Sequence, residues 1–393
     1  MSKVPSVLSV GAVDGYSIKI YRDFEDVLSR SGEIRNLGDR ADWKNAYFST
    51  PWLCAWLKRQ PKGAVRPLLL LAENAEGELI GFWPFVERPG ILGSRILWPF
   101  VSDEANYFHP ICTRKGGLAL VEGMHKLLKH FQLCWIPLMT DSFWLECMQT
   151  EVQNSKLLRL VRSPRKTAKI ICSEKIDFDE FWSNKMGGKS RKSFRYDQRA
   201  LEANGSVKFE SFESFDEVRE VMPATCVVEV ESWKSKERAG LYSIRGKRGF
   251  FFEVLPELAK EEKVRVSILS CDDVPIAWQI DLLEADWMGV HHLAFDEAWK
   301  KYSPGKQLLR HNLQRAWSEG REVDFLPGNL DYKEKLSDAI EPVLELHWVR
   351  KSIRGRLALW LFGLNVKARR KIRQGGKTTK ASETFRKALV EED

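Results

Sequence analysis

The sequence is poor in the features that mark exported, membrane-spanning and zinc-bound proteins. Its 393 residues include only seven cysteines, which are scattered and contain no CxxC pair. This spacing favours reduced thiols over a disulfide framework or a zinc site. No apolar run approaches the roughly 18 to 20 residues that a membrane span needs, and the first residues lack the charged-then-apolar pattern of an export signal. We therefore expect a cytoplasmic protein that needs no metal.

Acidic residues are missing from one long segment near the end of the sequence. No Asp or Glu occurs between Trp348 and Arg373, and the segment up to Ser382 holds eleven Lys or Arg. Because the net charge of the whole chain is only +8, the rest of the chain is slightly acidic. Basicity therefore does not indicate a DNA-binding fold. The mixture of apolar and basic residues predicts either a helix packed on the domain or peripheral contact of residues 350–373 with an anionic membrane.

Aromatic residues are abundant. The 15 Trp and the 44% hydrophobic content are ample for a large core, and the length predicts two domains or one double domain. A helix is expected from Thr50 with Pro51 in its first turn. Trp52 and Trp56 would share one face of this helix, so we interpret them as core residues.

A strand and helix pattern occurs twice. Each copy reads as a hairpin, a third strand, a loop, a helix and a buried strand. In the first copy we expect the hairpin at 66–72 and 79–86, the third strand at 95–101, the loop at 102–110, the helix at 117–130 and the buried strand at 133–138. In the second copy we expect the hairpin at 264–269 and 276–283, the third strand at 287–295, the loop at 296–303, the helix from 304 onward and the buried strand at 323–326. This duplication predicts an α/β fold with domains at 1–160 and 161–345 and a basic tail at 346–393.

The loop of the second copy contains Ser303-Pro304-Gly305-Lys306-Gln307. Pro304 suits a first helical turn, and Gly305 permits close approach of a ligand. The amides of Gly305, Lys306 and Gln307 would then form an anion site at the positive end of a helix dipole. An ordinary turn between strand and helix is the alternative interpretation.

Several further segments occur in a characteristic order. They are the basic helix 189–195, the Trp233-Lys234 pair, the 302–305 loop with its helix, the stretch 324–333 and, less specifically, 48–53 with 102–103. In this ordered set the chain resembles the CelD/BcsL-type acetyltransferase family, whose relatives include the double-domain FemABX aminoacyl transferases. The resemblance implies two tandem acyl-CoA N-acyltransferase (GNAT)-like domains with mixed sheets flanked by helices. It also implies an acyl-coenzyme A donor, acetyl first, and an acceptor from the cell envelope or an exopolysaccharide.

This resemblance assigns the donor to the second domain and an acceptor or structural role to the first. The donor site would comprise Leu293 and Phe295 on the strand edge and Ser303, Pro304, Gly305, Lys306 and Gln307 at the helix. Candidate bases are His291, His292, Glu229, Glu231 and Asp324. A strand alternates its faces, so only one of the two histidines can face the cleft, and we choose His292. Asp324 ends a buried strand, although it could equally cap the following turn.

The remaining site residues each have a structural alternative. Tyr332 is a candidate acid for the departing thiolate and Lys333 a partner for a phosphate, whereas both could lie on a surface helix. Arg191 and Arg195 would bind phosphates or an anionic acceptor, whereas a solvated face is the alternative. Trp233 and Lys234 would line the acceptor cleft, although a Trp is more often a core residue.

Two other functions are compatible with the same fold. One is an aminoacyl-tRNA-dependent transferase of the FemABX type, in which the basic helix would contact RNA. The other is a non-catalytic partner of a polysaccharide synthesis complex. The sequence leaves open the acceptor, the choice between amine and hydroxyl, the acyl chain length and the oligomeric state.

Overall fold

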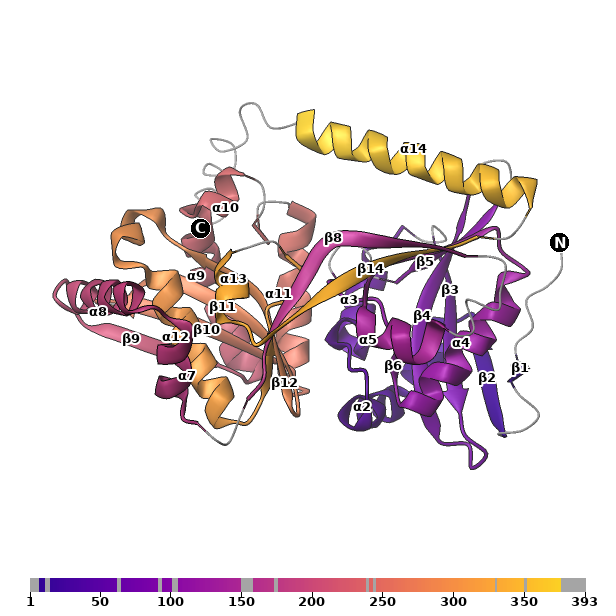
Figure 1. The fold of residues 1–393 in the computed structure, drawn as a ribbon, viewed down its shortest axis with the longest axis horizontal. Coiled ribbons are helices and arrows are strands. Elements are labelled where there is room, and N and C mark those ends of the chain that lie inside the picture. Colours follow the sequence, from indigo (N-terminus) through magenta and orange to yellow (C-terminus); the bar gives the residue numbers. More distant parts are fainter. Residues whose placement is uncertain are drawn as a thin grey trace.

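The computed structural model describes residues 7–10, 15–61, 65–90, 94–100, 105–149, 158–172, 176–237, 240–242, 245–328, 331–349 and 352–375. One long mixed sheet connects the two halves of the molecule, and helices flank it (Figure 1). Within these residues no helix is both long and apolar enough to cross a membrane.

The first half builds one end of the sheet, with strands in the order β1-β2-β3-β4-β5-β7. The predicted hairpin is β3–β4, and Ile96 of β5 pairs in parallel with Leu133 of β7 after the α4 crossover. The elements are β1 (Val7–Val10), β2 (Tyr16–Tyr21), α1 (Phe24–Leu28), α2 (Ser31–Arg40), η1 (Ala46–Phe48), α3 (Thr50–Lys58), β3 (Arg66–Glu73), β4 (Leu79–Pro89), β5 (Arg95–Pro99), β6 (Ile111–Cys112), α4 (Arg114–Leu128), β7 (Leu133–Thr140), α5 (Asp141–Phe143) and η3 (Trp144–Met148).

The second half repeats this plan, which confirms the predicted duplication. β10 and β11 form the hairpin, and Trp287 of β12 pairs in parallel with Glu322 of β13 after the α12 crossover. The elements are β8 (Leu158–Ile170), α7 (Phe178–Lys185), α8 (Gly188–Glu202), β9 (Val207–Phe212), α9 (Phe215–Val230), α10 (Trp233–Lys236), α11 (Arg245–Ala259), β10 (Val264–Cys271), β11 (Val274–Glu284), β12 (Trp287–Phe295), η4 (Glu297–Tyr302), α12 (Pro304–Ser318), β13 (Glu322–Asp324), α13 (Asp331–Leu336), β14 (Ala339–Val349) and α14 (Ile353–Gly375).

Two long strands that the sequence did not predict join the halves. β14 pairs with β7 of the first half and with β8, and β8 pairs with β13 of the second half. Both strands cross from one half to the other in Figure 1. The pattern of β8 is hidden because basic residues and Pro164 interrupt its apolar alternation. The predicted boundaries at 160/161 and 345/346 fall inside these strands, and the division into domains stays a prediction.

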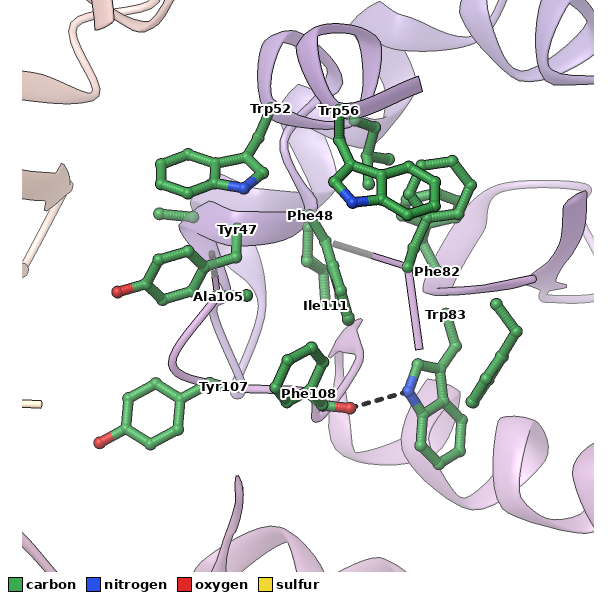
Figure 2. Close-up of a cluster of buried hydrophobic side chains, with 14 of the residues drawn as sticks. Tyr47, Phe48, Trp52, Trp56, Phe82, Trp83, Ala105, Tyr107, Phe108 and Ile111 are labelled. Atoms are coloured by element: carbon green, nitrogen blue, oxygen red, sulfur yellow. Dashed lines mark hydrogen bonds between the residues drawn. The ribbon is translucent and has the colours of Figure 1, made fainter. Parts of the chain in front are cut away.

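The tryptophan-rich helix α3 packs into the core, as predicted. Trp52 is fully buried and Trp56 nearly so (Figure 2). The Trp52 ring lies 5.4 Å from that of Phe250 in α11, so the core of the first half continues into the second. Trp83 Nε1 donates to the Phe108 carbonyl at 3.0 Å, and this bond fixes the loop before β6.

Candidate active site

Strands β12 and β13 part near the middle of the second half. Their parallel register ends at the pair of Gly289 and Asp324, whereas β12 continues to Phe295 with β11 as its neighbour. Beyond Gly289, β12 therefore has a strand partner on one side only in the described sheet. Such an edge can pair with the backbone or amides of a ligand.

Asp324 lies at this parting and is buried in a hydrogen-bonded cluster. The Thr167 hydroxyl and the Leu326 amide donate to Oδ1, and the Tyr107 hydroxyl donates to Oδ2 at 2.8 Å. Burial raises the pKa of Asp324, although its hydrogen-bond donors act in the opposite direction. A carboxylate has about four acceptor positions, so one position is left for an external donor.

A cavity of about 530 Å³ opens between the two halves and reaches Asp324. Tyr107 and His109 line it from the first half, and Lys169 and Glu322 line it from the second. Sequence reasoning did not name Tyr107, His109 or Lys169, because their meeting depends on contacts between distant parts of the chain. The cavity carries charges of both signs and is large enough for a polar small molecule.

Two half-buried lysines flank the parting. Lys234 Nζ donates to the Leu293 carbonyl of β12, and Lys333 Nζ donates to the Phe325 carbonyl just after β13, both at 2.6 Å. Loss of hydration lowers the pKa of each lysine to about 8. Among the described residues, neither lysine forms an ion pair with a carboxylate. An anionic or polarised group of a ligand would therefore stabilise their charged forms.

His291 and His292 point in different directions from β12. His292 Nε2 lies 2.9 Å from one carboxylate oxygen of Glu229. The other oxygen of this carboxylate accepts a hydrogen bond from the Tyr242 amide at 2.6 Å. His291 Nδ1 lies 3.2 Å from the Tyr47 hydroxyl of the first half. Burial lowers the pKa of His291 to about 3 and that of His292 well below its usual value, and raises the pKa of Glu229 to about 7. Both imidazoles are thus neutral at pH 7, and the assignment of His292 as the base stays a prediction.

Three other predicted residues lie around this region. Glu231 is the C-cap residue that follows α9, and its carbonyl accepts the Glu297 amide at 3.3 Å. Trp233 begins α10 and is 38% exposed, so it is not a core residue. Tyr332 on α13 is equally exposed, and its ring meets that of Phe325 edge-on at 6.2 Å.

The first turn of α12 corrects part of the predicted anion site. Pro304 begins the helix as expected, after Ser303 in a left-handed conformation (φ 52°). The Ser303 carbonyl accepts the amides of Lys306 at 3.0 Å and Gln307 at 3.1 Å, so these two predicted donors are not free. They make the first hydrogen bonds of the helix itself. In the described part of the chain, only the Gly305 amide of this turn has no such partner.

Gly305 allows α12 to lie directly on β12. A Cβ at this position would lie 2.9 Å from Phe295 Cδ1 and 3.0 Å from Leu293 Cδ2. The Ser303 hydroxyl donates to Asp197 at 2.8 Å, which places a carboxylate at the positive end of the helix. The residues therefore fit a coenzyme A pyrophosphate in part. The free amide and the β12 edge suit it, whereas Asp197 repels an anion until that carboxylate moves or is neutralised.

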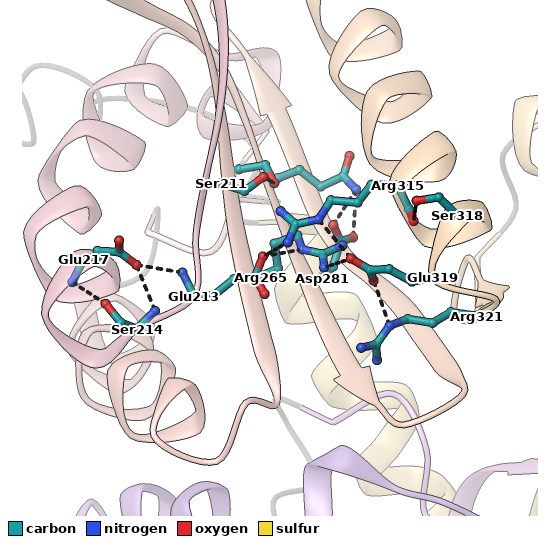
Figure 3. A network of polar contacts seen from close by, with 12 residues as sticks. Ser211, Glu213, Ser214, Glu217, Arg265, Asp281, Arg315, Ser318, Glu319 and Arg321 are labelled. Carbon is teal, nitrogen blue, oxygen red and sulfur yellow. Dashed lines mark hydrogen bonds and ion pairs between the residues drawn. The ribbon is translucent and has the colours of Figure 1, made fainter.

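An ion network fixes the other end of α12 to the sheet (Figure 3). The buried Arg265 donates to Glu319 at 2.6 Å and to Glu213 at 3.0 Å. Glu319 also accepts from Arg315 at 2.9 Å and from Arg321 at 2.8 Å. Because removing one partner of a buried charge is costly, this network holds the helix that carries the donor turn.

The predicted basic helix is α8. Its buried Phe194 faces α12, with Lys306 Nζ 5.6 Å from the ring centroid. On another side of α8 a hollow of about 590 Å³ is lined by Gly188, Arg191, Lys192, Arg195, Tyr196 and Arg199. Arg191 and Arg195 therefore line a different surface from Asp324 and the cavity between the halves.

One family model matches part of the second half of the chain. Residues 188–334 match the model of the acetyltransferase (GNAT) domain family. No curated protein matches the sequence.

Three solved structures are similar over most of their length. FemX has a TM-score of 0.57 at 11% identity, with 81% of this chain and 96% of that chain covered. A conserved Bacteroides thetaiotaomicron protein has a TM-score of 0.53 at 10% identity, covering 85% and 100%. The C-terminal domain of an Agrobacterium fabrum protein described as a lysylphosphatidylglycerol synthetase has a TM-score of 0.51 at 12% identity, covering 85% and 95%. These similarities concern the fold, and the predicted fold of two tandem GNAT-like domains is confirmed.

Proposed function

We propose that this protein is an acyltransferase that moves a short acyl group, acetyl first, from coenzyme A to an amine or hydroxyl. The acceptor would be a sugar, a polysaccharide or an envelope precursor, as the CelD/BcsL resemblance implies. One observation carries the proposal. Asp324 ends β13 where β12 parts from it, and it also lines the cavity between the halves. A proton acceptor in this position can serve an acceptor molecule in the cavity and a donor along β12.

Asp324 would accept the proton of the attacking amine or hydroxyl at its remaining acceptor position. Its raised pKa makes it a stronger base than an exposed carboxylate. Tyr107 and Thr167 hold the carboxylate in one orientation, which keeps the proton acceptor in place during the reaction.

Coenzyme A, when bound, supplies the acyl group as a thioester. The β12 edge, the Gly305 amide and Lys306 would hold this donor. The ammonium groups of Lys234 and Lys333 would attract anionic or polarised groups of the bound donor. They would also stabilise negative charge that develops near the parting of the strands, because a cation in a site of low water content acts strongly on such charge.

Calorimetric titration with acetyl-coenzyme A, followed by thiol release with amino sugar and polysaccharide acceptors, tests the proposal. We expect micromolar binding by the wild type. Asp324→Asn should bind the donor equally well but release thiol at least ~100-fold more slowly. Asp286→Asn is the matched control, since this exposed carboxylate lines the same cavity. Failure to bind any short acyl-coenzyme A would overturn the donor assignment.

An aminoacyl-tRNA-dependent transferase is the second candidate function. The basic hollow on α8 favours it, because four cations and the exposed ring of Tyr196 suit a phosphate backbone and its bases. Binding of charged tRNA that Arg195→Gln with Arg199→Gln weakens, without binding of acetyl-coenzyme A, would select this function. A non-catalytic partner of a polysaccharide synthase would bind neither donor.

A further inference from the structure

Helix α14 is attached to the first half by one narrow side. Among the side chains of this helix that the structure describes, Ala358 and Phe362 are the buried apolar ones. The Phe362 ring lies 5.6 Å from Trp98 and 5.3 Å from Trp135, on β5 and β7. Figure 1 shows α14 running along the outside of the molecule, above the strands β8 and β14. The attachment thus leaves one side of the described part of the helix exposed.

A second apolar row lies on exposed positions of the same helix. Ile353 is 88% exposed, Leu357 36%, Trp360 61% and Leu364 45%. Their spacings of four, three and four residues place them on one side of an α-helix. Single exposed apolar residues are normal, but an aligned row of four, including a Trp, indicates an interaction surface.

The charge around this row is of one sign. Arg354 and Arg356 are exposed beside it. The sequence contains no Asp or Glu from Trp348 to Arg373, and the segment to Ser382 holds eleven Lys or Arg. This complementarity selects an anionic partner, and the apolar row requires that the partner also accept Leu and Trp side chains. The surface of an anionic bilayer meets both requirements, because it offers phosphate groups above an acyl boundary where Trp is favoured.

We propose that the exposed side of α14 binds the surface of an anionic membrane. The helix would lie in the plane of the headgroups, with Ile353, Leu357, Trp360 and Leu364 inserted and the arginines at the phosphates. The attachment through Phe362 keeps the rest of the protein on the water side. This inference is independent of the proposed acyl transfer, because none of the described side chains of α14 lines the cavity that reaches Asp324.

Flotation of the full chain with vesicles tests the inference. We expect binding to vesicles of phosphatidylglycerol and phosphatidylcholine, little binding to phosphatidylcholine alone, and release at high salt. Leu357→Ser with Trp360→Ser should weaken the binding by about tenfold or more, since both inserted side chains are lost. Both positions are exposed, so the melting temperature should stay close to that of the wild type.

Tyr196→Ser is the matched control, because Tyr196 is another exposed aromatic residue in basic surroundings, on α8. It should leave vesicle binding unchanged. Equal vesicle binding by the α14 double variant and the wild type would overturn the proposal. Sedimentation that shows a dimer in the wild type and a monomer in the double variant, without vesicle binding, would assign the row to a contact between two copies instead.

Discussion

Buried titratable groups serve different purposes at different places in this protein. Asp324 and Glu229 lie near the parting of β12 and β13, where hydroxyl, amide or imidazole groups hold them. Asp281 lies elsewhere on β11, and the Gln279 side chain is the only donor to its carboxylate among the described residues, at 2.7 and 3.0 Å. Burial raises the pKa of all three. A raised pKa therefore indicates an active site only where a cavity reaches the group, which is true of Asp324.

Donor binding should depend on pH through Lys234 and Lys333. Their pKa values of about 8 mean that both carry a full charge at pH 6.5 and lose it as the pH rises through 8. We expect the affinity for acetyl-coenzyme A to fall above pH 8 and Lys333→Met to reduce this dependence. Calorimetry from pH 6.5 to 9.5 measures it, with the exposed Lys58→Met as control. If the affinity for acetyl-coenzyme A does not change across this pH range, the role assigned to the two lysines is contradicted.

Asp281→Asn should stabilise the fold at alkaline pH. The pKa of Asp281 is about 7 in the folded protein, above its usual value of 3.8. Between these values the folded protein holds a proton that the unfolded chain has lost, so stability falls as the pH rises to 7. Asn is neutral throughout, and we expect a gain of about 1 to 4 kcal/mol at pH 8 that shrinks towards pH 4. Urea unfolding measures it, and a gain independent of pH would show that the carboxylate does not titrate.

At the scale of elements, a glycine allows each of the two crossover helices to lie close to the sheet. Glycine removes the side chain where helix and strand approach most closely, at Gly116 for α4 and at Gly305 for α12. A Cβ on Gly116 would lie 1.9 Å from the Ile80 carbonyl oxygen of β4, whereas the neighbours of Gly305 are side-chain ends. Backbone cannot move aside as side chains can, so α4 tolerates substitution less than α12 does.

Gly116→Ala should therefore destabilise the protein by about 3 kcal/mol or more, because overpacking against backbone displaces the helix. Gly32→Ala in α2 is the matched control, since no atom lies within 4 Å of its added Cβ. It should stabilise the protein by about 0.5 to 1 kcal/mol through helix propensity alone. Chemical denaturation compares the two variants, and similar effects would show that the contact between α4 and β4 is loose.

At the scale of the whole molecule, strands and side chains both join the halves. β8 and β14 extend the sheet from one half into the other. Tyr107 reaches Asp324, and Tyr47 reaches His291. The candidate site thus exists only when both halves are folded and in contact, and we expect them to unfold together.

Leu346→Ala tests this coupling. Leu346 is fully buried in the middle of β14, where its backbone is in register with Ile136 of β7 and Leu160 of β8. Its truncation should cost about 2 to 5 kcal/mol and lower one common transition in calorimetry and in hydrogen exchange of both halves. Leu118→Ala, at a half-exposed position, should change little. Two separate transitions would show that the halves unfold independently.

The local sequence pattern was sufficient to predict the hairpins and several of the helices. Alternating apolar residues predicted the hairpins β3–β4 and β10–β11, helical spacing predicted α3 and α12, and Pro304 marked the start of α12. The buried strand β13 was also predicted, at 323–326, because burial on both faces leaves a short apolar run, although the strand ends two residues earlier, at Asp324.

Contacts between distant residues required the tertiary structure. Tyr107 and Asp324 lie 217 positions apart, and Tyr47 and His291 lie 244 apart. Such hydrogen-bonded partners produce no periodic pattern in the sequence, because what relates them is only that each buried polar group needs a partner in space. The same holds for β8, whose place in the sheet is decided by β13 and β14 on either side of it. Periodicity records which face of an element is buried, whereas only packing and hydrogen bonding determine what buries it.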